Sequence, residues 1–262
     1  MNYKDQLNRS LKFATTPKRI ISLVPSQTEL LVDLGLESFI VGITKFCVHP
    51  DNLRKKKKVV GGTKTVHFDK IRAANPDIVL CNKEENTQAM ISELENIAPV
   101  HISDIDNLDH ALELISMYGD LFSVVEKAEV IKTTIKKEYE AFVQFIAGFP
   151  RLTVAYFIWK NPWMVAASDT FINSMLIINA FKNYFGNLRR YPEIEIEDLK
   201  DVDLILLSSE PYPFKEKDIL DFKKLVPNTK IKIVDGEFFS WYGSRLAHAF
   251  TYFKALHQNL ER

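Results

Sequence analysis

Hydrophobic residues follow two patterns that alternate along most of the chain. Short aliphatic runs predict buried strands, and longer segments with apolar residues at every third or fourth position predict helices. Because each strand is followed by a helix, the order is typical of parallel sheets with right-handed crossovers. The chain is therefore expected to have an α/β fold. The predicted strands cover residues 19–24, 39–43, 59–60, 78–81, 99–102, 152–158, 164–166, 204–207 and 231–234.

One predicted helix is much longer than the others. Ser123 stands three residues before Glu126, which predicts a capping box at a helix start. Apolar residues then recur at helical spacing until Gly148 and Pro150 provide a stop signal. The sequence thus predicts two doubly wound lobes with parallel sheets, bridged by this helix. The predicted boundaries are residues 1–106 for the N-terminal lobe, 107–150 for the helical linker with its bridging helix 123–147, and 151–262 for the C-terminal lobe.

Composition narrows the class of protein. The 262 residues include 46% hydrophobic and 26% charged residues, the mixture of a globular protein. Thirty-four basic residues balance 34 acidic ones, so a nucleic-acid binder is disfavoured. The basic run Arg54–Lys58 is short, and we interpret it as a solvated loop rather than a phosphate site.

Cysteines and the N-terminus add little chemistry. Cys47 and Cys81 are too few for a disulfide framework, and with His49 and His67 they lack metal-ligand spacing. No metal ligand from the protein is therefore expected. The first ten residues contain no apolar signal region, and no long apolar segment follows. As it stands the sequence predicts a cytoplasmic protein, or a periplasmic one if a leader was removed or the start was misassigned.

Catalytic motifs are missing from the sequence. It contains no G-x-S-x-G elbow, no P-loop and no dinucleotide fingerprint. No motif places a pair of carboxylates for acid–base chemistry. The sequence therefore favours a binding protein without intrinsic cofactor over an enzyme.

Candidate ligand contacts follow the strands of the first lobe, because ligands of such sheets bind outside the carboxyl ends of the strands. Ser26 begins a helix and could cap it, leaving backbone N–H groups for a ligand, although an ordinary turn has the same pattern. The Gly61-Gly62 pair permits a close backbone approach. We expect the loops at Ser26, Phe46, Lys64 and Lys83 to meet at one edge. The candidates in this lobe are Ser26, Lys45, Phe46, Thr63 and Lys64.

Aromatic residues follow the strands of the second lobe. Trp159 and Trp163 flank a proline turn, and a group of aromatics from Phe238 to Tyr242 follows the last strand. They either form an apolar wall for a large planar ligand or belong to the rim of the core. The candidates in this lobe are Trp159, Trp163, Tyr191, Tyr212, Phe239, Trp241, Tyr242 and Arg245.

Five short motifs follow one another in a fixed order along the first part of the chain. These are Arg19-Ile-Ile-Ser-Leu-Val-Pro-Ser-Gln-Thr-Glu29, Leu34-Gly35-Leu36, Val41-Gly42-Ile43, Phe68-Asp69-Lys70-Ile71 and Asn75-Pro76-Asp77-Ile78-Val79. With these motifs the chain resembles the periplasmic substrate-binding proteins for vitamin B12 and iron chelates, and the resemblance extends from Arg19 to Leu260. The resemblance implies the class III fold, with two α/β lobes on one long helix and a cleft that closes little.

The resemblance also implies roles for individual residues. Phe46 matches an aromatic that lines the family's pocket, and Tyr191 matches one that precedes a proline in the opposing lobe. The aromatic loop matches Phe239, Trp241 and Tyr242, whereas a tryptophan found near Thr63 in vitamin-binding relatives is missing here. Asp69 and Glu197 match the acidic residues that dock the family onto a membrane permease. Their alternative role is that of ordinary charges at helix starts.

Together these features predict a non-enzymatic protein that binds a corrinoid or a ferric chelate in the cleft. The main hypothesis is the substrate-binding component of an ABC-type importer, acting as a monomer with a permease as partner. The alternative is a cytoplasmic binding or salvage protein of the same fold that is not coupled to a transporter. Aromatic walls would cover the faces of the ligand, while Lys45, Lys64 and Arg245 would meet its polar edges.

Overall fold

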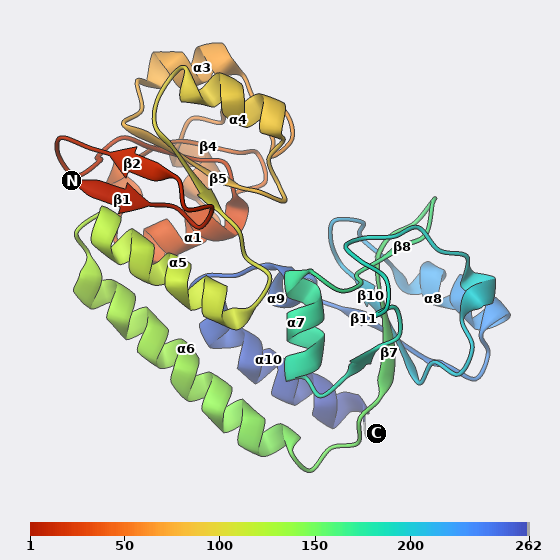
Figure 1. Ribbon diagram of the computed structural model, residues 1–262. Coiled ribbons are helices and arrows are strands. Elements are labelled where there is room, and N and C mark those ends of the chain that lie inside the picture. Colours follow the sequence, from red (N-terminus) through yellow and green to blue (C-terminus); the bar gives the residue numbers. More distant parts are fainter. Residues whose placement is uncertain (261–262) are drawn as a thin grey trace. The chain divides into compact units, whose positions relative to one another are not determined.

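The computed structural model describes residues 1–260, and Figure 1 shows its elements. The chain divides into two compact units. The first unit contains Met1–Ile105, Asp109–Lys136 and Tyr242–Ala247. The second contains Asp106–Leu108, Lys137–Trp241 and the chain from His248 onward. Each unit has its own main sheet.

The sheet of the first unit is entirely parallel, in the order β4-β3-β5-β6. A short antiparallel hairpin, β1–β2, precedes it. The strands are β1 (Asn2–Lys4), β2 (Ser10–Lys12), β3 (Ile20–Ser22), β4 (Ile40–Ile43), β5 (Ile78–Asn82) and β6 (Val100–Ser103). The helices are α1 (Pro25–Asp33), η1 (Glu37–Phe39), α2 (Leu53–Lys56), α3 (Phe68–Ala74), α4 (Gln88–Glu95) and α5 (Leu108–Leu121).

Alternation of side chains along these strands builds two apolar layers. Val79 and Cys81 of β5 share one face with Ile102 of β6, and this face packs under α3 and α4. The next residue in each strand points to the opposite face, where His101 contacts Tyr118 of α5. Figure 1 shows α3 and α4 on one side of the sheet and α1 and α5 on the other. The sheet is therefore covered on both faces, as the sequence predicts for a doubly wound lobe.

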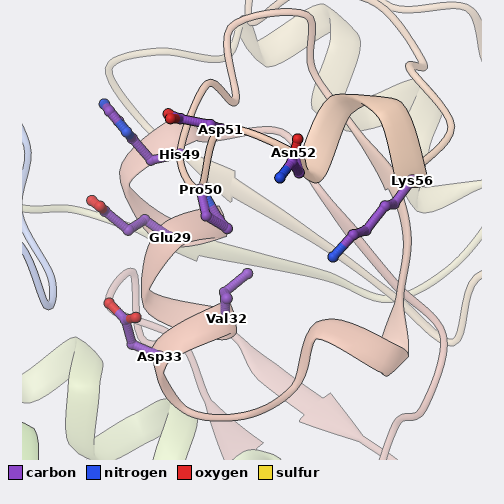
Figure 2. A pocket seen from close by; sticks show the side chains of 8 residues that line it. All are labelled: Glu29, Val32, Asp33, His49, Pro50, Asp51, Asn52 and Lys56. Atoms are coloured by element: carbon purple, nitrogen blue, oxygen red, sulfur yellow. The ribbon is translucent and has the colours of Figure 1, made fainter.

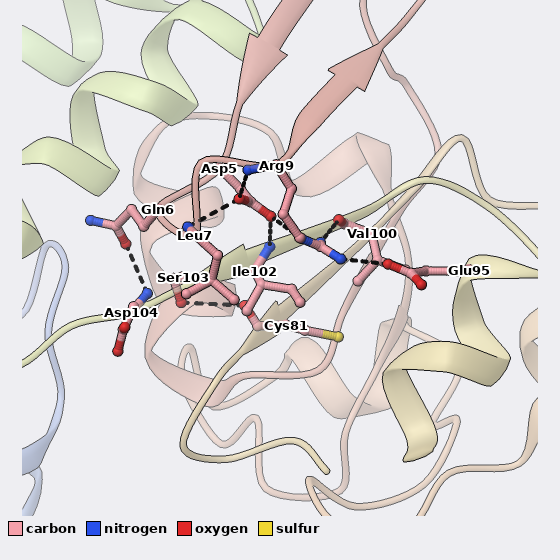
Figure 3. A network of polar contacts seen from close by, with 10 residues as sticks. All are labelled: Asp5, Gln6, Leu7, Arg9, Cys81, Glu95, Val100, Ile102, Ser103 and Asp104. Carbon is pink, nitrogen blue, oxygen red and sulfur yellow. Dashed lines mark hydrogen bonds and ion pairs between the residues drawn. The ribbon is translucent and has the colours of Figure 1, made fainter. Parts of the chain in front are cut away.

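The loop of the β1–β2 hairpin covers the outer edge of β6 through its side chains. Asp5 is buried, and its carboxylate accepts a hydrogen bond from the Ile102 N–H at 3.2 Å. Arg9 forms an ion pair with Asp5 at 2.7 Å and donates to the Val100 carbonyl at 2.5 Å. Figure 3 shows these contacts. Side chains thus take the hydrogen bonds that a neighbouring strand would otherwise make with this edge.

The sheet of the second unit is mixed. β11, β10 and β7 run parallel, and β7 also pairs with β8 in the antiparallel sense and with β9 in the parallel sense. The antiparallel strand departs from the all-parallel sheet that the sequence predicts, because the turn after β7 is too short for a crossover. The strands are β7 (Thr153–Trp159), β8 (Met164–Val165), β9 (Lys182–Asn183), β10 (Leu204–Ser208) and β11 (Lys230–Val234).

Helices cover both faces of this second sheet. Phe157 of β7 and Leu207 of β10 pack on one face against Phe222 of α8. On the opposite face, Tyr156 of β7 contacts Phe239 of α9 at a centroid distance of 5.0 Å. The helices are α7 (Phe171–Ile178), η2 (Ile196–Asp198), α8 (Glu216–Leu225), α9 (Glu237–Ser240) and α10 (Leu246–Leu260). The sequence pattern does not predict α8 or α9.

The long helix α6 (Val125–Ile146) is the bridge between the two lobes. Its 22 residues make a rod of about 33 Å at 1.5 Å per residue. The boundary between the units falls inside it, after Lys136. The predicted capping box is wrong, because the helix begins at Val125 and Ser123 has a left-handed backbone with φ of 56°. None of the described helices is long and apolar enough to cross a membrane.

Candidate functional site

A buried polar network lies at the carboxyl ends of β5 and β6 in the first unit. The Asn82 side-chain amide donates to Ser103 Oγ at 3.0 Å. The Gln27 amide donates to Ser103 Oγ at 2.5 Å and to the Tyr242 hydroxyl at 3.2 Å. Tyr118 completes the network by donating to Gln27 Oε1 at 2.7 Å. One glutamine side chain thus joins α1, β6, α5 and the segment before α10.

The two tyrosines of this network remain neutral. Burial raises the pKa of Tyr118 and of Tyr242 well above the usual value of 10.0. Hydrogen bonds to Gln27 and Ser103 oppose the shift at Tyr242, but burial dominates. Both hydroxyls therefore act as uncharged hydrogen-bonding groups that fix the carboxyl edge of the sheet.

The loops at this edge are joined to one another. The Asn86 amide donates to the Thr63 carbonyl at 2.8 Å, and Asn86 Oδ1 accepts from the Asn82 N–H at 2.8 Å. Lys64 Nζ donates to the Glu84 carbonyl at 2.6 Å. The loop with Thr63 and Lys64 therefore meets the loop after β5, as the sequence predicts for strand ends of a parallel sheet.

Phe46 extends from this edge into solvent. Its side chain is 48% exposed, and Lys45 Nζ lies 4.9 Å from the centroid of its ring. The neighbouring Gly61 has φ of 140°, and a Cβ there would lie 2.6 Å from Cα of Val66. A Cβ at Gly62 would lie 3.3 Å from the Phe46 ring. The two glycines thus allow the close approach that the sequence predicts.

Arg245 pairs with a carboxylate of α1, and Ser26 does not cap that helix. Arg245 donates two hydrogen bonds to the Glu29 carboxylate, at 2.9 and 2.7 Å, so its guanidinium already serves an internal carboxylate. Burial raises the pKa of Glu29, and the hydrogen bond and charge of Arg245 oppose this shift. Ser26 is buried and is the second residue of α1, whereas Val24 is the N-cap. The predicted capping role of Ser26 is therefore wrong.

A pocket of about 530 Å³ opens beside α1. Figure 2 shows three carboxylates, one imidazole and one ammonium group around it. Among residues 1–197 and 199–260, no group of three or more His, Cys, Asp or Glu side chains is arranged to hold a metal ion. Its lining makes the pocket a polar hollow along the helix. Its lining residues are Glu29, Val32, Asp33, His49, Pro50, Asp51, Asn52 and Lys56.

Trp159 is the exposed aromatic of the second unit. It ends β7, is 39% exposed, and meets the edge of the half-buried Tyr212 ring at a centroid distance of 5.7 Å. Trp163 instead packs into the core, edge-on to Phe222 at 4.8 Å and parallel to Phe214 at 6.3 Å. Of the two tryptophans that flank the turn, only Trp159 offers a broad exposed surface.

The aromatic loop after β11 lies in the interior. Phe239 is 0%, Trp241 7% and Tyr242 5% exposed. The Trp241 indole N–H donates to Glu210 Oε1 at 2.9 Å, and the Ser240 hydroxyl donates to the same oxygen at 2.6 Å. Burial raises the pKa of Glu210, opposed by these hydrogen bonds. The loop therefore builds the core and positions a carboxyl group, which agrees with the second of the two alternatives that the sequence left open, a ligand wall or the rim of the core.

The remaining predicted residues lie at the surface or near it. Tyr191 is half-buried, and the Arg190 guanidinium lies 5.9 Å from its ring centroid. The predicted docking residues Asp69 and Glu197 are both exposed, Asp69 in the first turn of α3 and Glu197 in η2. Arg72 lies 3.4 Å from Asp69, in an exposed pair that contributes little to stability.

Sequence reasoning missed several polar residues at these edges. Gln27, Asn82, Ser103 and Glu210 are each half-buried or buried, and all hydrogen-bond to other side chains. The sequence contains a signal for Asn82, Ser103 and Glu210. Each ends or follows a buried aliphatic run, and such a position falls at the carboxyl edge of a parallel sheet. Gln27 had no such signal, because its position within α1 resembles any helical glutamine.

Comparison with known proteins agrees with this architecture. The family model for periplasmic binding proteins matches residues 20–224. The chain is 27% identical over 187 residues to an uncharacterized ABC transporter substrate-binding lipoprotein, YvrC, of Bacillus subtilis. That match covers 68% of this chain and 59% of the lipoprotein. A vitamin B12-binding protein of Vibrio campbellii is 23% identical, with 71% of this chain and 69% of that protein covered.

Solved structures share the fold. The vitamin B12-binding protein BtuF of Vibrio cholerae has a TM-score of 0.80 at 17% identity, covering 94% of this chain and 99% of that chain. A periplasmic heme-binding protein from Pseudomonas aeruginosa has a TM-score of 0.81 at 21% identity, covering 92% of each chain. The matched family model spans most of the chain, and the fold has two α/β lobes on one long helix. The chain belongs to the periplasmic binding protein family.

Proposed function

We propose that this chain is the substrate-binding component of an ABC-type importer and that its ligand is a large planar metal complex, either a corrinoid or a ferric chelate such as haem. One observation carries the proposal. Among the phenylalanine, tyrosine and tryptophan side chains of residues 1–260, only Phe46 and Trp159 are classed as exposed. Phe46 lies three residues after β4 and Trp159 ends β7, so both stand at the carboxyl edge of a sheet, where ligands of such sheets bind.

The chemistry of these two positions suits a flat, amphipathic ligand. An exposed aromatic ring covers apolar area, and its stacking preference favours another planar π-system. Lys45, beside Phe46, brings an ammonium group that can meet carboxylate or amide edges of the ligand, and the exposed Lys64 follows in the next loop. Relatives named for vitamin B12, heme and iron support this ligand class.

A binding assay with a defined panel tests the proposal. The protein is titrated with cyanocobalamin, cobinamide, haem and a ferric siderophore, and the emission of its three tryptophans is followed. At least one compound is expected to bind with a Kd below about 10 μM, roughly −7 kcal/mol. If none of the four binds below that concentration, the proposed ligand class is wrong.

The importer role has its own test. We propose that Asp69 and Glu197 meet basic residues of a permease, and that the protein works outside the cytoplasmic membrane, as relatives named periplasmic or lipoprotein do. Asp69→Lys and Glu197→Lys should leave the ligand Kd unchanged and reduce uptake in cells that carry the cognate transporter. Glu93→Lys, an exposed acid on α4, is the matched control. Equal uptake by the wild type and both reversed variants would contradict docking at these positions.

A further inference from the structure

Trp159 stands at the outer end of a chain of aromatic rings that leads into the core. Its ring meets Tyr212 edge-on at 5.7 Å, and Tyr212 meets Phe214 at 4.7 Å. Phe214 lies parallel to Trp163, with 6.3 Å between centroids and 5° between planes. Trp163 is the last residue of the turn that follows Trp159. The orientation of the exposed indole therefore depends on the contacts that fix this turn.

An ion pair fixes the same turn to α8. Lys160 Nζ donates to Asp218 Oδ1 at 2.7 Å and to Asp221 Oδ2 at 3.2 Å. The same ammonium group lies 5.4 Å from the centroid of the Trp163 ring. The side chain directly after Trp159 therefore contacts both the helix and the inner tryptophan.

Asp218 is a buried anchor for this turn. It is 0% exposed, and its second carboxylate oxygen accepts the Lys215 N–H at 2.9 Å in the capping box of α8. Burial disfavours its ionised form, but hydrogen bonds from Lys160 and the Lys215 backbone outweigh it and hold the pKa of Asp218 below its usual value. The hydrogen bond to Asp218 likewise raises the pKa of Lys160. Both groups stay charged, and the pair resists disruption because a lone buried charge is unfavourable.

We propose that Lys160 and Asp218 are positioning residues that orient the Trp159 indole for the ligand. This inference rests on the proposed function, since it takes Trp159 as a ligand contact. Neither charged group needs to touch the ligand. Together they fix the position of the backbone at the end of β7. The row of rings formed by Tyr212, Phe214 and Trp163 then holds the exposed indole at a fixed angle.

The test separates this role from a general loss of structure. Lys160→Met alone would leave Asp218 buried without a counter-charge, so the main variant is Lys160→Met/Asp218→Asn, which removes both charges at similar volume. The single variant Lys160→Arg, with Asp218 unchanged, keeps a cation opposite the carboxylate. The matched control is Lys224→Met, which removes an exposed partner of Asp221 at 3.3 Å. Circular dichroism first shows which variants are folded.

Fluorine NMR of protein labelled with fluorotryptophan reports on the Trp159 ring without any ligand. Trp159→Phe assigns the resonance. We expect this resonance to shift and broaden in the double variant, to recover in Lys160→Arg and to stay unchanged in Lys224→Met. An unchanged Trp159 resonance in the folded double variant would overturn the inference, whether or not the proposed ligand class is correct.

The affinity for a bound compound from the panel supplies the second measurement. The double variant should bind about tenfold more weakly, a coupling typical of neighbouring residues. In a Trp159→Ala background the same charge removal should have almost no further effect. An equal loss in both backgrounds would mean that the pair acts independently of Trp159 and would also overturn the inference.

Discussion

His101 should make the first unit sensitive to acid. It lies in the middle of β6, is 1% exposed, and packs edge-on to Tyr118 at 5.3 Å. Neither of its ring nitrogens meets a hydrogen-bond partner of good geometry among the described residues. Burial lowers its pKa from 6.5 to about 4, with the nearby Asp5 carboxylate opposing and the Arg9 guanidinium reinforcing the shift.

The sign and size of the effect follow from this shift in pKa. As the pH falls below 6.5, His101 takes up a proton in the unfolded chain before it does so in the folded one. The contribution of neutral His101 to the free energy of unfolding is therefore fully present above about pH 7, and it declines as the pH falls toward 4. Protonation of His101 lowers the free energy of unfolding by about 3.4 kcal/mol in total. Roughly 2.4 kcal/mol of this is lost between pH 7 and pH 4.5.

The variant His101→Phe tests this reasoning. It keeps a ring against Tyr118 and removes the titrating group, so its stability should fall by about 2.4 kcal/mol less than that of the wild type over the same range. Removing two unpaired buried nitrogens should also stabilise the variant at pH 7 by about 1 kcal/mol. His257, whose pKa burial lowers to about 4, is present in both proteins and cancels in the comparison.

The assay is urea unfolding followed by far-ultraviolet circular dichroism at pH 7 and pH 4.5. Tryptophan fluorescence is unsuitable, because Trp159, Trp163 and Trp241 all belong to the second unit. Tyr118→Phe is the control, since it removes the hydrogen bond to Gln27 but keeps the imidazole. It should retain the full acid sensitivity. Equal pH dependence in His101→Phe and the wild type would refute the assignment to His101.

Three further outcomes follow from the packing. Asp5→Asn should lower stability by about 2 kcal/mol in urea unfolding, because the buried carboxylate is the acceptor for the edge strand and for an arginine; unchanged stability would mean that the hairpin does not cover this edge. The emission of Trp241 should change with a midpoint above pH 4.5 as Glu210 ionises, and Glu210→Gln should abolish that transition. Gly61→Ala should destabilise the protein by more than about 1 kcal/mol, because its φ is 140° and a Cβ would meet backbone atoms, whereas Gly148→Ala, with nothing within 4 Å, should not.

The fold was largely predictable because its signals are local and repeated. Aliphatic runs of β3, β5, β7 and β10 alternate with helical segments, and a parallel sheet buries such runs on both faces. The capping box predicted at the start of α6 was wrong because Ser123 belongs to the end of α5. The N–H of Val124 bonds to the Gly119 carbonyl, so Ser123 in its left-handed conformation closes α5 instead of opening the next helix.

The candidate site was less predictable, because exposure is decided by contacts distant in sequence. Phe46 and Phe239 both follow a strand, yet one is 48% exposed and the other fully buried. The packing of Phe239 against Tyr156 and Phe253 distinguishes them. Gln27 meets Ser103 across 76 positions of sequence. A single sequence contains no signal for such a pairing.

The affinity of three variants for a bound compound from the panel tests the central claim most directly. Phe46→Ala and Trp159→Ala should each weaken binding at least tenfold, about 1.4 kcal/mol, because each removes an exposed aromatic from the carboxyl edge of a sheet. Ile177→Ala, which truncates a side chain 62% exposed on α7, should leave the Kd unchanged. Equal affinity for all three variants and the wild type would contradict the assignment of the ligand to these two aromatic positions.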